Sequence, residues 1–157
     1  MSIFKIELKN ITELRKADGS VNRYPPVGEL KKFLVMYMES GQGIVILHDS
    51  FYDYQYDTKL SSYHKVDSHN VIGHMLDVVV ENDDKLYLIV EFNDTFNPEK
   101  DYICFYRANL ESDPREQERT LKITNLFAID LITIVESEKE AITSRSSFEP
   151  YFISRET

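Results

Sequence analysis

The chain has 157 residues, of which 42 % are hydrophobic, and a formal net charge of −9. This composition excludes an intrinsically disordered chain, and the length suits one domain, residues 1–157, with its own core. The acidic balance argues against a duplex nucleic-acid partner, which requires clustered Lys and Arg. It favours solubility or binding to a basic protein.

The single cysteine, Cys104, excludes an internal disulfide and a zinc site built from cysteines. The first residues lack the basic segment and apolar run of a signal peptide. No apolar stretch approaches the about 18 residues that a membrane-spanning helix needs. The sequence therefore predicts no membrane association, no metal and no cofactor. It also predicts a location in the cytoplasm or in a particle assembled there.

The first half of the chain is expected to hold a strand, a helix and a short buried strand. Residues 3–8 alternate in polarity, which is typical of a half-buried strand. Apolar residues then recur at helical spacing, which predicts the main helix over about residues 26–40. The wholly apolar run 44–47 indicates a central strand ending at His48. The tyrosine-rich stretch 50–66 is expected to be a loop.

The second half is expected to be mostly strand, and it includes a hairpin that turns at Asn82-Asp83-Asp84. The fold class that follows is α+β: a β-rich, mostly antiparallel sheet, closed or half-closed into a barrel, with one main helix and a short C-terminal helix. The expected strands are 69–80, 85–92, 101–109 and 121–135, followed by a short helix in 136–144 and an extended segment in 148–153.

His48 is the first candidate for chemistry, because it follows a buried strand. A histidine there suits a general base, since its pKa lies near neutrality, but it would equally cap the sheet. Asp130 lies inside an otherwise apolar strand, and a buried acid must be paired or hydrogen-bonded. Orienting a catalytic His48 would satisfy this acid, and so would a bond to Arg107.

The strand that contains Cys104 is the second candidate. A reactive thiol needs a base or a positive field and some exposure, whereas a lone cysteine in an aromatic strand is more often a buried hydrophobe. Because side chains alternate across a strand, Cys104 and Tyr106 share one face, while Phe105 and Arg107 share the other. Arg107 then needs an acidic partner, for which Asp130 and Asp101 are candidates.

Two further histidines offer little for metal binding. His69 and His74 differ by five positions in a strand and therefore point to opposite faces. A zinc site formed by His48, His69 and an acid remains an alternative without any spacing signature.

The order of these stretches resembles the capsid-maturation (prohead) proteases of tailed phages, which are related to the herpesvirus assemblins. The resemblance covers about residues 18–142, and order and spacing carry it rather than any single motif. Asn22-Arg23-Tyr24-Pro25 is similar to the family's segment before its first helix. The other similar stretches are residues 43–49 at the catalytic histidine, Ser68-His69 in the hairpin, residues 91–95 at its end, residues 104–108 on the nucleophile strand, and residues 127–132.

The resemblance implies roles for individual residues. His48 would be the base, Asp130 an orienting acid, and Arg107 the arginine beside the nucleophile. Phe105 and Tyr106 stand where the family has its serines, and neither forms an acyl-enzyme. Cys104 lies one position away, and a one-residue slip turns a side chain to the other face of the sheet.

The function expected from this pattern is that of a phage head protein with a prohead-protease-like fold but without catalysis. Such a protein would serve as a virion structural or decoration protein, or in capsid assembly, with capsid or other virion proteins as partners and with homo-oligomers allowed. One alternative is an active protease, with His48 acting on Cys104 or Ser68, that cleaves scaffold and capsid proteins. A second alternative is a small acidic inhibitor of a host or defence protein.

Aromatic residues in the stretch after His48 are expected to form the interaction surface, because aromatics are enriched at interfaces. The alternative is that this stretch folds onto its own sheet. The residues concerned are Phe51, Tyr52, Tyr54, Tyr56 and Tyr63.

Overall fold

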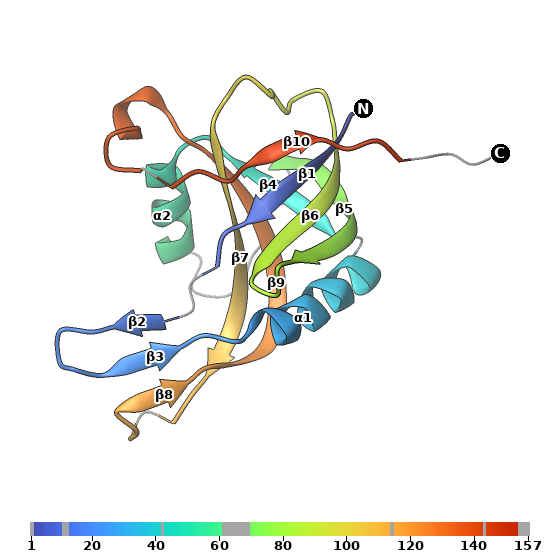
Figure 1. Ribbon diagram of the computed structural model, residues 1–157. Coiled ribbons are helices and arrows are strands. Elements are labelled where there is room, and N and C mark those ends of the chain that lie inside the picture. Colours follow the sequence, from blue (N-terminus) through green and yellow to red (C-terminus); the bar gives the residue numbers. More distant parts are fainter. Residues whose placement is uncertain are drawn as a thin grey trace.

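The computed structural model describes residues 2–10, 13–41, 43–60, 70–113, 115–142 and 144–153, with the backbone alone at 56–60. It contains two sheets and two α-helices (Figure 1). No described helix is long and apolar enough to cross a membrane. The elements are β1 (Ser2–Leu8), β2 (Glu13–Arg15), β3 (Val21–Arg23), α1 (Val27–Ser40), β4 (Ile44–His48), α2 (Phe51–Leu60), β5 (Val71–Glu81), β6 (Lys85–Phe92), β7 (Tyr102–Glu111), β8 (Glu118–Thr120), β9 (Lys122–Thr133), a 3₁₀ turn (Glu136–Glu138) and β10 (Phe148–Pro150).

The larger sheet has seven strands in the order β10-β1-β6-β5-β4-β9-β7, and the smaller has three in the order β2-β3-β8. Within the larger sheet all neighbours are antiparallel except β4 and β9, which run parallel. The predicted α+β class with a mostly antiparallel sheet is therefore confirmed. The exception matters for function, because it brings β4 and β9 side by side.

The expected closure into a barrel is not found, because β10 and β7 are the outer strands of an open sheet. The sheet does curl, as twisted sheets do. The backbone N–H of Lys9 donates to the carbonyl of Cys104 on β7 over 2.9 Å, and the N–H of Ser146 donates to the carbonyl of Tyr102 over 2.9 Å. β1 ends at Leu8, one residue before the first of these contacts. In the described part of the chain, this bond therefore links the residue after β1 to β7, and the two strands do not form a pair.

The predicted hairpin turn is confirmed between β5 and β6. Asn82 and Asp83 have φ values of 55° and 62°, in the left-handed region that these two residue types tolerate better than most. The register pairs Glu81 with Lys85 next to the turn. The hairpin thereby fixes which residues of both strands face the core.

Alternate residues of the large sheet face one hydrophobic core. Phe92 of β6, Ile129 of β9 and Cys104 of β7 all belong to it. The ring of Phe92 stacks on that of Phe96 with 4.0 Å between centroids. The predicted main helix is confirmed as α1, which packs against β5, β6 and β9. Its buried residues are Leu30, Leu34 and Tyr37.

α2 is a correction, because a loop was expected from residue 50 onward. The Ser50 hydroxyl accepts a hydrogen bond from the backbone N–H of Asp53 over 3.1 Å, which caps the start of the helix. The Glu138 carboxylate accepts from the N–H of Phe51, with both oxygens at 3.2 Å. The spacing Ser50-x-x-Asp53 is the sequence signature of a helix start, and it reveals α2 in retrospect.

Two smaller expectations also change. The short C-terminal helix predicted in residues 136–144 is reduced to the 3₁₀ turn Glu136–Glu138, whose Glu138 serves as the cap for α2. No strand was expected between 101–109 and 121–135, yet β8 lies there and pairs in parallel with β3. The small sheet projects from the main body as an arm (Figure 1).

Candidate functional site

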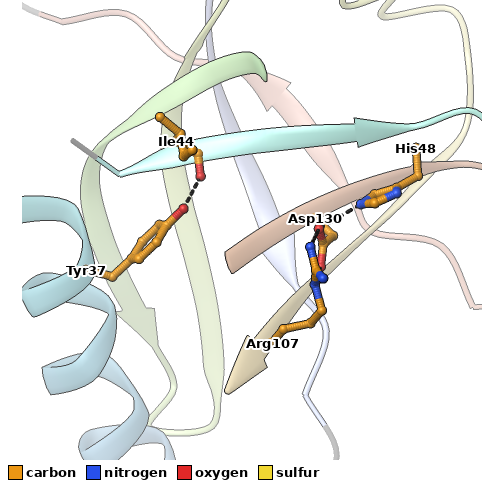
Figure 2. Close-up of polar contacts among 5 residues, drawn as sticks. All are labelled: Tyr37, Ile44, His48, Arg107 and Asp130. Carbon is orange, nitrogen blue, oxygen red and sulfur yellow. Dashed lines mark hydrogen bonds and ion pairs between the residues drawn. The ribbon is translucent and has the colours of Figure 1, made fainter. Parts of the chain in front are cut away.

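Three adjacent strands bring His48, Asp130 and Arg107 together (Figure 2). The Nε2 atom of His48 lies 2.7 Å from Oδ1 of Asp130. Arg107 donates from Nε to Oδ2 over 2.6 Å and from an Nη to Oδ1 over 2.9 Å. Asp130 thus satisfies both of the partners considered for it, whereas Asp101, the other candidate for Arg107, binds Arg145 instead over 2.7 Å.

The strand register explains why these side chains meet. Asp130 pairs with Ile46 on β4 and with Phe105 on β7, and His48 pairs with Ile132 two residues further along. Their neighbours in sequence, such as Ile129, face the core. By alternation, the three polar side chains lie on the opposite face of the sheet, the face against which α2 packs.

The site is a buried ion pair with a histidine attached to it. Asp130 has no solvent exposure, while the side chains of His48 and Arg107 are 9 % and 15 % exposed. A carboxylate in such a place requires compensation, and the bidentate guanidinium supplies it together with geometric specificity. Asp130 is therefore committed to Arg107 at the same time as it orients His48.

Tyr54 of α2 covers this site, which agrees with the alternative that the aromatic stretch after His48 folds onto its own sheet. Its ring lies edge-on to the His48 imidazole, 5.0 Å between centroids, and stacks on Phe105 at 6.4 Å. Burial, aided by the negative charge of Asp130, raises the pKa of Tyr54 to about 12. The neutral phenol consequently closes the surface over His48 and Phe105.

Tyr37 of α1 approaches the same region from the other side. Its hydroxyl donates to the carbonyl of Ile44 at the start of β4 over 2.5 Å (Figure 2). Burial, with Asp130 nearby, raises its pKa to about 12. From the sequence, Tyr37 could be identified only as an apolar position of the helix. Helical periodicity shows which residues face the core, but it does not show that a hydroxyl binds the backbone of a strand.

Phe105 of β7 is one of the two residues that stand at the serine positions in the resemblance described above. Its side chain is on the face of Asp130, directly across the strand pair, and lies under Tyr54. Cys104 and Tyr106 lie on the core side, as predicted, and Cys104 is fully buried. Among the described residues, the β7 side chain on the same face as His48 and Asp130 is therefore the ring of Phe105, and neither the Cys104 thiol nor a serine lies there.

Cys104 should be inert towards thiol reagents in the folded protein. Burial raises the pKa of this thiol far above its ordinary value, and the negative charge of nearby Asp130 raises it further. We expect labelling by iodoacetamide at pH 8 to be slower by about three orders of magnitude in native buffer than in 6 M guanidinium. Mass spectrometry of the modified chain measures both rates, and rapid native labelling would contradict the assigned burial.

The remaining candidates are Ser68, His69 and the aromatic residues of the predicted interaction surface. Ser68, His69 and Tyr63 lie outside the described residues, as does the side chain of Tyr56. The side chains of Phe51 and Tyr54 are half-buried against their own sheet, so Tyr52, which is 71 % exposed, is the described member of the predicted aromatic surface that faces solvent.

Two open pockets flank Phe105. One has a volume of about 300 Å³ and is lined by Tyr24, Phe127 and Arg107 among others, and the second, of about 450 Å³, includes Phe51. Neither pocket is lined by His48 or Asp130. A molecule in either pocket would therefore meet Phe105, and in the first pocket also Arg107, while the His48 imidazole stays behind Tyr54.

The described residues include no group of three or more His, Cys, Asp or Glu side chains able to hold a metal ion. Comparison of the chain with protein-family models, with curated proteins and with solved structures finds no match. The chemistry of the site must therefore be judged from its own geometry.

Tyr54 makes the stability of the fold sensitive to alkaline pH. Its pKa is raised to about 12 in the folded chain, against about 10 in an unfolded chain, so between these values the unfolded state releases a proton that the folded state retains. The contribution of Tyr54 to stability is therefore constant below about pH 10 and is lost between pH 10 and 12, by on the order of 1–2 kcal/mol because the group is only partly buried. Urea denaturation at intervals from pH 8 to 12 measures the slope, and Tyr54→Phe should make it shallower.

Proposed function

We propose that this chain is a non-catalytic phage head protein with a prohead-protease-like fold, acting in the virion or in capsid assembly. The observation that carries the absence of catalysis is Phe105, which lies across the strand pair from Asp130 and beneath Tyr54. A phenylalanine side chain has no group able to attack a carbonyl. The phage assignment rests on the resemblance in sequence order described above.

The geometry of the acid supports the same proposal. In a working triad, the acid serves the histidine, which in turn activates a nucleophile. Here Arg107 donates to both oxygens of Asp130, and the Nε2 atom of His48 points back to that acid. These bonds join three strands and serve as a structural clasp. In the same proposal, the curled sheet, in which Lys9 after β1 bonds to Cys104 on β7, corresponds to a half-closed barrel.

The test uses heads and proheads of the phage that encodes the chain. We expect mass spectrometry of purified particles to find the chain as a constituent. The amino termini of the capsid and scaffold proteins should be the same in the wild type and in the variants His48→Ala and Cys104→Ala. His48→Gln, which retains a hydrogen-bonding group for Asp130, controls for loss of folding.

Two results would contradict the proposal and identify an alternative. Loss of capsid or scaffold cleavage in His48→Ala and His48→Gln particles would show an active protease. Absence of the chain from particles, together with a one-to-one complex with a host protein, would show an inhibitor.

A further inference from the structure

An apolar segment follows β10 at the surface. Tyr151, Phe152 and Ile153 are 40 %, 88 % and 54 % exposed. They are three of the seven large hydrophobic side chains that the described part of the chain exposes, and the only three of these that are consecutive. Single exposed hydrophobic residues are ordinary on protein surfaces, whereas contiguous ones mark interaction sites.

The segment is held in place by the sheet. The backbone N–H of Tyr151 donates to the carbonyl of Ile3 over 2.9 Å, which continues the pairing of Pro150 with Phe4 between β10 and β1. Figure 1 shows the chain running past the end of β1 and away from the body of the molecule. Phe152 therefore projects from an ordered edge.

Beside this projection lies a hollow of about 430 Å³, lined by residues 2–4 and 150–153. None of these seven lining residues is charged, although the chain has 29 % charged residues and a net charge of −9. A basic partner would be met by acidic side chains, and the described residues that line the hollow include none. The apolar side chains among them are suited to another apolar surface.

We propose that this surface joins two copies of the chain about a twofold axis, with Phe152 of each copy inserted into the hollow of the other. A twofold interface requires that one patch be complementary to itself. This patch carries both a projecting aromatic side chain and an apolar hollow of suitable size, formed by the same short segments. The proposal does not depend on the function proposed above.

The contact is made by side chains rather than by strand addition. Odd-numbered residues of this segment face β1, as the bond from the Tyr151 N–H shows, so the backbone of Pro150 faces the open edge of β10. Proline has no N–H to offer there, and a proline on an edge strand interrupts pairing with another strand. The side chains beyond it are left to make the contact.

Sedimentation equilibrium of the full chain tests the proposal. We expect a monomer–dimer equilibrium that is strengthened by salt, because two copies with a net charge of −9 repel one another. Phe152→Glu should raise the dimer dissociation constant at least about 30-fold, as expected for a central aromatic anchor. Met36→Glu is the matched control, since Met36 is 59 % exposed on α1, outside the patch, and the substitution adds the same charge.

The thermal midpoint of the Phe152→Glu monomer should equal that of the wild-type monomer, because the side chain is 88 % exposed. Phe152→Ser provides a second variant without an added charge and should weaken the dimer in the same direction. A chain that stays monomeric up to about 1 mM would overturn the proposal. Open-ended oligomers, or a dimer unaffected by either Phe152 variant, would overturn it as well.

Discussion

Replacing Asp130 with alanine is expected to lower the free energy of unfolding by about 3–5 kcal/mol. Asp130 has no solvent exposure and is the shared partner of Arg107 and His48. Its removal leaves the Arg107 guanidinium, whose side chain is 15 % exposed, with a buried charge that nothing balances. Guanidinium denaturation followed by circular dichroism measures the loss, which corresponds to a fall in melting temperature of about 10 °C or more.

A double variant distinguishes the unpaired charge from loss of packing. Asp130→Leu combined with Arg107→Met removes both charges and retains apolar volume, and it should recover most of the stability that Asp130→Ala loses. His48→Gln is expected to cost much less than Asp130→Ala, because the ion pair survives. If Asp130→Ala changed the free energy of unfolding by less than about 1 kcal/mol, the clasp would have no structural role.

The sequence was informative about this site because its three residues are exceptional in their surroundings. An acid between Ile129 and Leu131 and an arginine among aromatic residues each require a partner, and strand alternation placed Arg107 and Cys104 on opposite faces. The structure confirms both inferences. The choice between Asp130 and Asp101 could not be made, because it depends on the pairing of β7 with β9.

The parallel pairing of β4 with β9 also could not be predicted from the sequence, because it too depends on which distant strands pair. His48 and Asp130 are 82 residues apart in the chain, and periodicity reports only local geometry. The covering helix α2 was missed because its side chains lack an apolar stripe: tyrosines alternate with Asp53 and other polar residues. The start of α2 could nevertheless have been found from the capping spacing Ser50-x-x-Asp53, despite the poor helical periodicity.

The core on the opposite face of the sheet should be equally sensitive to substitution. Phe92→Ala is expected to cost about 3–5 kcal/mol, because Phe92 has no exposure and its ring stacks on Phe96 at 4.0 Å. Loss of the ring leaves a cavity that surrounding strands fill only partly. Phe92→Leu, which keeps most of the apolar volume, is the matched control and should cost less than half as much. Guanidinium denaturation of the three proteins measures the difference.

Combining Phe92→Ala with Asp130→Ala tests whether core and clasp are independent. Three strand spacings separate β6 from β9, about 14 Å, and the register places the two side chains on opposite faces. Their costs should therefore add within about 0.5 kcal/mol, whereas Asp130 and Arg107 variants should couple strongly. Coupling above about 1 kcal/mol between Phe92 and Asp130 would mean that the sheet transmits strain between its faces. Additivity would mean instead that the clasp can be altered by substitution while the core stays intact.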